Sequence, residues 1–190
     1  VLGRAPGRVE LLGNHTDYNG GLVMAAAVNR FTAVAGRPIP DRACRVQAVN
    51  FQGETTFDPS AIEPSEPGEW PNYVKGVVWA LNEAAGKPLT DGFEMAIIGD
   101  VPLGAGLSSS ASLQASVACF LLEAGLVPGM APVRDDDTAR LALAKILQRS
   151  ENGFVGVASG LLDQFSSLFG RAHHALYLDC KTHEHARLPL

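Results

Sequence analysis

Apolar and β-branched residues dominate the first third of the chain and are interrupted by short turn-forming segments. Small apolar residues run from Gly21 to Arg37, and further strand-like runs cover Arg45–Asn50 and Thr55–Phe57. Turn-forming residues separate these runs at Pro38–Arg42 and at Gly53. Runs of this kind separated by turn residues are typical of paired strands. We therefore expect this third of the chain to form a β-sheet.

The apolar spacing changes to a helical period further along the chain. From Val74 to Ala85 apolar side chains recur at i, i+3 and i+4, and Gly86 follows them as a stop signal. Phe93–Ile98 has the composition of a strand. The mostly apolar segment Ser110–Ala124 predicts a buried helix that Gly125 closes.

The remainder predicts one more helix and a terminal hairpin. Thr138–Ser150 has a helical pattern, and Asp135–Asp137 precedes it. Three aspartates could hold a metal ion, but acidic residues at this position ordinarily stabilise a helix N-terminus, which is the interpretation we favour. Leu176–Leu178 and Ala186–Leu188, separated by Lys181–His185, predict a hairpin.

Composition narrows the possible partners. The 190 residues carry a formal net charge of −5, and their Lys and Arg residues are scattered, so nucleic acid and anionic lipid are disfavoured as partners. The longest apolar stretch, Leu113–Ala124, is interrupted by polar residues and is shorter than the ~20 residues that span a bilayer. We therefore expect a soluble protein that does not enter a membrane.

The cysteines and the chain ends add two expectations. Cys44, Cys119 and Cys180 are odd in number and far apart, which fits neither a disulfide framework nor a zinc site and predicts a reducing, cytoplasmic setting. The chain opens on Val1 inside an apparent motif and stops at Leu190 on an apolar run. We expect it to be part of a longer protein.

The most informative segment is Gly104–Ser112, which joins the expected strand Phe93–Ile98 to the helix that follows. Small residues let backbone N–H groups surround an anion, and the helix directs its positive dipole end at the same point. Hydroxyls beside such a turn can bind phosphate oxygens or Mg²⁺. The segment has no Lys as in a P-loop, and Ser109 stands where the dinucleotide fingerprint needs a third Gly. An ordinary strand-to-helix turn is the alternative.

A second segment, Gly7–Gly21, crowds polar and charged side chains between apolar residues and turn-formers. His15, Thr16, Asp17 and Asn19 could bind the hydroxyls of a polyol, since a site built to hydrogen-bond hydroxyls discriminates strongly. The alternative is an Asx-type turn with a capping Asp. A third segment, Glu151–Phe165, places two carboxylates among Gly and apolar residues.

Of these two carboxylates, Asp163 is the more unusual. It lies among Leu161, Leu162 and Phe165, and a carboxylate in apolar surroundings needs a partner or a chemical role. Taken alone, a helix cap or a salt bridge would explain it, and Glu151 would ordinarily be solvated.

Together the three segments resemble the GHMP kinases, and within that family the galactokinases. Gly7–Asn19 resembles the galactokinase signature, Pro102–Ser112 the ATP-binding motif, and Glu151–Gln164 the segment with the catalytic Asp; Trp70–Gly76 is also similar. The resemblance covers nearly all of residues 1–190. It implies the family's N-terminal α/β domain, a two-layer α+β fold like domain 2 of ribosomal protein S5, in which a mixed sheet is backed by helices.

The resemblance also implies a reaction, the transfer of the ATP γ-phosphoryl group to the C1 hydroxyl of galactose or a related hexose with the help of Mg²⁺. Asp163 would take or orient the sugar proton, Arg8 would face the transferring phosphoryl group, and Ser110 with Glu151 would hold Mg²⁺. The implied ATP-binding residues are Gly104, Ala105, Gly106, Leu107, Ser108, Ser109, Ser110 and Trp70; the implied sugar-binding residues are Asn14, His15, Thr16, Asp17 and Asp163.

The sequence departs from the family pattern in three places. Galactokinases carry Glu at the position of Asn14, Asn at that of Glu10, and Cys-Gly where this chain has Ser159-Gly160. Asn donates as well as accepts hydrogen bonds, so it would tolerate a carboxylate at C6 of the sugar. A hexuronic acid or a modified hexose therefore stays open as the substrate. The family's C-terminal half is absent, which implies that the fragment alone is inactive.

Three other function classes remain as alternatives. A GHMP kinase for another alcohol, such as mevalonate or homoserine, is disfavoured by the run His15–Tyr18. A non-catalytic sensor that binds sugar and ATP is disfavoured because Ser110-Ala111 is intact. A dinucleotide-dependent oxidoreductase is disfavoured by the missing third Gly. The sequence does not indicate an oligomeric state.

Overall fold

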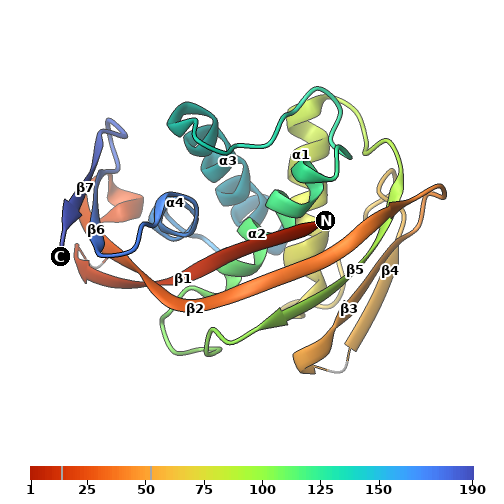
Figure 1. Ribbon diagram of the computed structural model, residues 1–190, viewed down its shortest axis with the longest axis horizontal. Coiled ribbons are helices and arrows are strands. Elements are labelled where there is room, and N and C mark those ends of the chain that lie inside the picture. The colour runs from red at the N-terminus through yellow and green to blue at the C-terminus, as the bar shows by residue number, and fades with distance from the viewer. Residues whose placement is uncertain (14, 52) are drawn as a thin grey trace.

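A single mixed sheet of seven strands organises the chain (Figure 1). The computed structural model describes residues 1–13, 15–51 and 53–190. The strands follow the order β4-β3-β5-β2-β6-β7, with β1 paired to β2 off this path, and only the pair β3–β5 is parallel among the pairs described. The strands are β1 (Leu2–Leu12), β2 (Leu22–Ile39), β3 (Cys44–Ala48), β4 (Gly53–Phe57), β5 (Gly92–Gly99), β6 (His174–Asp179) and β7 (His185–Pro189).

The long strand β2 lies at the centre of the sheet and pairs with three other strands. Strand β1 lies along one edge of β2. On the other edge, β5 pairs with Thr32–Ile39 and β6 pairs with Leu22–Ala26. The stretch of β2 between these two partners faces the segment that leaves β5, because Asp100 exchanges hydrogen bonds with Phe31. The segment from Asp100 onward is thereby held near the middle of the molecule.

In the described part of the chain, four α-helices are found. They cover one face of the sheet, as Figure 1 shows. They are α1 (Pro71–Ala85), α2 (Ser109–Glu123), α3 (Asp137–Arg149) and α4 (Leu162–Phe169). Short helical turns lie at Asp17–Asn19 and Val49–Phe51, and a π-helical turn, Ser150–Val155, follows α3 directly. Among the residues with described placement, no helix is both long enough and apolar enough to cross a bilayer.

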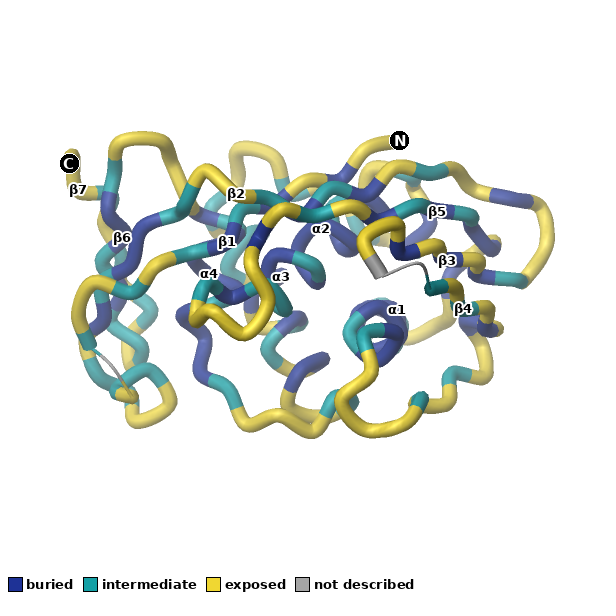
Figure 2. Tube along the Cα trace, turned by 90° about the horizontal axis from the view of Figure 1, so that it is seen from below, coloured by how far each residue is buried: buried dark blue, intermediate teal, exposed yellow. Residues whose placement is uncertain are grey.

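Helix α2 is the most deeply enclosed element. It packs against β1 so closely that a Cβ at Gly3 would overlap the Ser116 carbonyl, which explains why glycine stands there. Small side chains on the helix, such as Ala111 and Ala115, are fully buried. Figure 2 shows the same distribution, with buried residues along α1 and α2 and exposed residues in the connecting loops. The start of α2 is therefore fixed rigidly relative to β1.

The sheet, the helices and the hairpin expected from the sequence are confirmed, with ends shifted by a few residues. The prediction that the aspartates begin a helix is also confirmed, since the Asp136 side chain accepts hydrogen bonds from the backbone N–H groups of Thr138 and Ala139. The sequence analysis missed strand β1, helix α4 and the π-helical turn. These three elements hold Arg8, Asp163 and Glu151, whose flanking Gly and polar residues hide the periodicity.

Candidate active site

The loop between β5 and α2 has the conformation of an anion cradle. Gly104 and Gly106 have φ of 65° and 69°, a left-handed backbone that glycine adopts without strain, and Ser108 is also left-handed with φ of 53°. The N-terminus of α2 carries no side-chain capping hydrogen bond from Ser108, and the buried Ser108 hydroxyl has no described partner. The first backbone N–H groups of α2 are thus available to an anion.

Strand β1 fixes this loop by its backbone and by the Arg8 side chain. The Arg8 N–H donates to the Leu107 carbonyl at 3.1 Å, and Arg8 Nη1 donates to the Gly106 carbonyl at 2.7 Å. A Cβ at Gly7 would lie 2.6 Å from the same Leu107 oxygen. The glycine before Arg8 therefore allows the strand and the loop to touch.

Arg8 also contacts Asp163, which lies 155 positions away in the chain. Its Nε donates to Asp163 Oδ1 at 2.8 Å, and Nη2 contacts the same oxygen. Helix α4 presents Asp163 in its first turn, and both side chains are largely but not fully buried, with exposed fractions of 12% for Arg8 and 25% for Asp163. The structure thus brings together a guanidinium, a carboxylate and the glycine-rich loop.

The segment expected to bind sugar forms a tight turn that contacts Gly160, in the loop before α4. Thr16 Oγ1 donates to the Gly13 carbonyl at 2.7 Å and Asn19 Nδ2 to the His15 carbonyl at 3.0 Å, so both of these side chains brace the turn. Asp17 lies against Gly160, where a Cβ would overlap its carboxylate. His15 is exposed, and Asn14 lies outside the described residues. Through Gly160, Asp17 contacts the loop that leads into α4.

Glu151 lies on the π-helical turn and is buried beside polar side chains of α2 and α4. Only 4% of the residue is exposed. Burial raises the pKa of the Glu151 carboxyl, and hydrogen bonds from the Ser110 and Ser159 hydroxyls act in the opposite direction. A π-helical turn of this kind is often found at functional sites. In this structure the π-helical turn brings the Glu151 carboxylate next to the first turn of α2.

An apolar cavity of about 380 Å³ lies between the end of β5 and the start of α2. The residues that line it are Thr32, Ala48, Asn50, Ile97, Gly99, Asp100, Val101, Pro102, Leu103, Ser109 and Leu113. The sequence analysis missed this cavity, although Pro102 and Leu103 directly before the glycines could have indicated apolar contacts. Trp70 does not line it among the described residues; it caps α1 and packs against the core.

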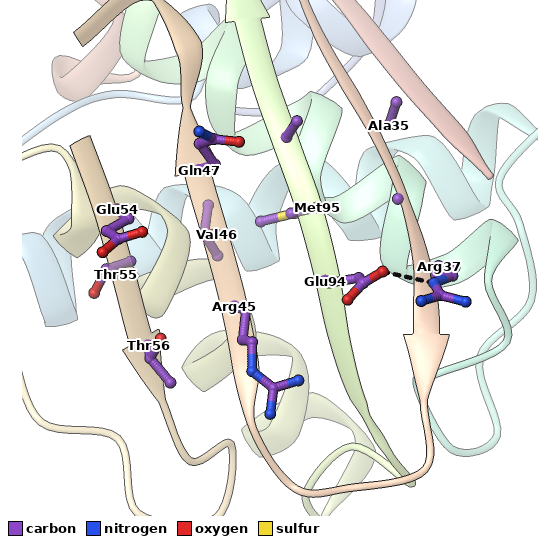
Figure 3. A pocket seen from close by; sticks show the side chains of 12 residues that line it. Ala35, Arg37, Arg45, Val46, Gln47, Glu54, Thr55, Thr56, Glu94 and Met95 are labelled. Atoms are coloured by element: carbon purple, nitrogen blue, oxygen red, sulfur yellow. Dashed lines mark hydrogen bonds and ion pairs between the residues drawn. The ribbon is translucent and has the colours of Figure 1, made fainter. Parts of the chain in front are cut away.

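A second hollow, of about 600 Å³, lies on the face of the sheet opposite the helices (Figure 3). Strands β2 to β5 line it, and the Arg37 Nε donates to Glu94 Oε1 at 2.6 Å across it. None of the described residues singled out from the sequence lines this hollow. No group of three potential metal-binding His, Cys, Asp or Glu side chains is found within the part of the chain that the structure describes.

Comparison with known protein families identifies the fold. The model of the GHMP kinases N-terminal domain matches residues 72–171, which is more than half of the chain. The chain belongs to the GHMP kinases. The galactokinase galactose-binding signature matches residues 1–38 of this GHMP kinase.

Similar proteins place this GHMP kinase near the galactokinases. It is 45% identical over its whole length to a galactokinase of Roseiflexus sp. (strain RS-1) and 38% identical to one of Lactococcus lactis, and it covers 46% and 45% of those proteins. The crystal structure of Lactococcus lactis galactokinase complexed with galactose superposes with a TM-score of 0.86 at 37% identity, covering 99% of this chain and 47% of that one. Methanococcus jannaschii mevalonate kinase shares the fold, with a TM-score of 0.77 at 16% identity over the whole chain and 56% of that protein. The chain thus spans about half the length of the galactokinases it matches.

Proposed function

We propose that the protein transfers the γ-phosphoryl group of ATP to the C1 hydroxyl of galactose or a related hexose. The observation that carries this proposal is that one guanidinium, that of Arg8, contacts both the Asp163 carboxylate and the Gly106 carbonyl of the loop. Arg8 thus contacts both the proposed base, Asp163, and the proposed phosphate-binding loop. This arrangement fits phosphoryl transfer, which depends on positioning and charge neutralisation. The match to the galactose-binding signature supports the choice of sugar.

In the proposed reaction, the loop Gly104–Ser110 binds the ATP phosphates through backbone N–H groups and hydroxyls. The apolar cavity beside Leu103 and Leu113 accepts the nucleotide base. Trp70 supports this end of the site indirectly, because its ring packs against Gly53 at the start of β4. His15, Asp17 and Asn14 bind sugar hydroxyls, and Thr16 holds their turn in shape.

Asp163 accepts the proton of the C1 hydroxyl as the sugar oxygen attacks the terminal phosphorus. The bond between that phosphorus and the bridging oxygen of the β-phosphate breaks, and ADP leaves. Arg8 orients the Asp163 carboxylate and stabilises negative charge on the transferring group. The products are the sugar 1-phosphate, ADP and the proton taken up by Asp163, which passes to solvent after the products leave, so that atoms and charge balance.

Ser110 and Glu151 fit a magnesium site. Both supply oxygen, the donor atom that Mg²⁺ prefers, and Mg²⁺ commonly combines one or two carboxylates with substrate phosphates. Glu151 is buried among hydroxyl and amide partners, an environment in which a cation would offset the cost of its charge. When bound, the metal would neutralise charge on the ATP phosphates.

A substrate panel tests the proposed function. The intact protein is incubated with ATP, Mg²⁺ and single hexoses or hexuronic acids, ADP release is measured, and ³¹P NMR identifies the phosphorylated carbon. We expect ATP consumption with galactose or a close relative and phosphate at C1. A preference for a hexuronic acid would support a role for Asn14 in reading C6. Binding of sugar and ATP with no turnover would contradict the proposal and favour a sensor.

A further inference from the structure

Gln164 hydrogen-bonds the proposed metal ligand Glu151 from inside the core. Its side chain is fully buried, and its Nε2 donates a hydrogen bond to Glu151 Oε2. The Ser159 hydroxyl donates to the same oxygen at 3.2 Å. The other carboxylate oxygen, Glu151 Oε1, takes part in neither of these two bonds. These two bonds hold Glu151 through Oε2, and the hydroxyl of Ser110, the other proposed magnesium ligand, is a further partner of the carboxylate.

The same turn of α4 also presents Asp163. Consecutive residues of an α-helix point about 100° apart, so the first turn can direct two neighbours at two different targets. Asp163 reaches Arg8 on β1, whereas Gln164 reaches Glu151 on the π-helical turn. One rigid element thereby fixes both the proposed base and the proposed metal ligand.

The burial of Gln164 has no other evident benefit. Its Oε1 atom has no hydrogen-bond partner among the described residues, and an unsatisfied buried amide oxygen is unfavourable. An apolar side chain of similar size would avoid this cost. The hydrogen bond to Glu151 is what the glutamine contributes at this position.

We propose that Gln164 is a positioning residue that orients Glu151 for Mg²⁺ and ties the metal ligand to the helix that carries Asp163. This inference rests on the proposed function. Partners that orient a metal ligand without touching the metal commonly change metal affinity when they are replaced. Gln164 itself does not touch substrate or metal in this role.

The test measures metal affinity directly in the intact protein. Mn²⁺ replaces Mg²⁺, ADP is present at saturation, and free Mn²⁺ is followed by electron paramagnetic resonance. We expect Gln164→Leu to weaken Mn²⁺ binding by about 10- to 100-fold, the range typical of such partners. The Mg²⁺ concentration that supports half-maximal turnover should rise in parallel, and excess Mg²⁺ should restore much of the rate.

Two further variants separate positioning from folding. Gln164→Asn keeps the amide but is too short to reach Glu151, so it should behave like Gln164→Leu and replaces it if the leucine variant does not fold. Ser167→Ala removes a hydrogen bond of 2.9 Å from the same helix to the Pro6 carbonyl, without contact to Glu151, and should leave Mn²⁺ affinity unchanged.

The possible results distinguish the two proposals. If both Gln164 variants bind Mn²⁺ as the unaltered protein does, the positioning role is wrong while the metal site stands. Equal losses in Ser167→Ala and the Gln164 variants would also overturn it, because they would reflect general loosening of α4. If the unaltered protein binds no Mn²⁺ with ADP, the metal assignment in the proposed function fails.

Discussion

The two halves of the candidate site rest on different foundations. The loop Gly104–Ser110 is continuous in sequence with α2, which is enclosed by the larger hydrophobic cluster together with α1, β3 and β5. Asp163 lies on α4, an eight-residue helix above a smaller cluster that includes Phe165, Phe169 and Leu176. The first half is an exposed local loop attached to a deeply packed helix, and the second is assembled from segments far apart in the chain.

Because of this difference, we expect nucleotide binding to depend on the first half and the orientation of Asp163 to depend on the second. The backbone conformation of the proposed phosphate-binding loop is largely set within one strand–loop–helix unit, and Arg8 of β1 adds two hydrogen bonds to it. The base depends on contacts from α4 to β1 and to the π-helical turn. Substitutions in the second half should therefore change turnover more than nucleotide affinity.

The largest effect is expected at Asp163. A positioned general base typically contributes about 10²- to 10⁴-fold to the rate, so Asp163→Asn should lower kcat by that factor. The Kd for a nonhydrolysable ATP analogue should not change, because the cradle is anchored elsewhere. Steady-state kinetics and equilibrium binding measure the two quantities. The matched variant Asp179→Asn alters a half-buried carboxylate that caps the β6–β7 turn and should keep full activity.

Arg8→Lys tests whether one side chain links the two halves. Lysine keeps the charge but cannot reproduce the separate contacts of Nε and Nη1 to Asp163 and Gly106. We expect kcat/KM to fall by about 10²-fold, the cost of a misplacement near 1 Å, with a rise in KM for ATP as well as a fall in kcat. A change confined to kcat would show that the bond to Gly106 does not hold the loop.

The sequence predicts the first half well and the second half poorly, for a physical reason. The conformation of the loop can be predicted from Gly104, Gly106 and the serines. The glycines allow a left-handed backbone, and the helix that follows is adjacent to them in the chain. Nothing local to Asp163 says that its partner is Arg8, since that pairing depends on the register of β1 against β2 and on how α4 packs. The resemblance to a family supplied what the local pattern lacked.

The same limit applies to details around the loop. Gln164 has the pattern of a core position, and only the fold shows that its amide meets Glu151. The apolar cavity beneath the loop is likewise lined by residues of separate segments: Thr32 of β2, Asn50 of the turn after β3, and Leu113 of α2. No single segment of the sequence predicts this cavity. Thr16 has a polar side chain in a polar segment, yet its hydroxyl is committed to the Gly13 carbonyl.

Gly160→Ala is expected to act on sugar binding. The added methyl group would overlap the Asp17 carboxylate and displace it from the turn beside α4. We expect KM for the sugar to rise by about tenfold, equivalent to a loss of ~1.4 kcal/mol, with little change in KM for ATP. Gly68→Ala strains a backbone with φ of 86° but meets no atom nearby, and it should leave both KM values unchanged. Equal KM values for Gly160→Ala and the unaltered protein would show that Asp17 does not contact the sugar.

The smallest effect concerns the stability of the half that carries Asp163. Asp137 at the start of α3 accepts hydrogen bonds from Arg187 of β7 and from Arg140, and Arg187 also donates to the Phe169 carbonyl at the end of α4. The Arg187 hydrogen bonds chiefly, with help from Arg140, hold the pKa of the Asp137 carboxyl at about 2, below its ordinary 3.8. The carboxylate is 41% exposed, so solvent screening limits its contribution to about 1 kcal/mol or less.

Because the folded-state pKa is lowered, this contribution is present above about pH 4 and is lost as the pH falls through 2. Asp137→Asn should therefore lower Tm at pH 7 by up to about 4 °C, and the gap to the unaltered protein should close near pH 2, as followed by circular dichroism. Asp135→Asn removes a fully exposed carboxylate 3.5 Å from Arg140 and should leave Tm unchanged. A gap for Asp137→Asn that persists at pH 2 would mean that packing at the helix start, and not ion pairing, joins α3 to the hairpin. In that case the second half of the site would be held by its small apolar cluster and by the hydrogen bonds from α4 to β1 and the π-helical turn, without a contribution from Asp137.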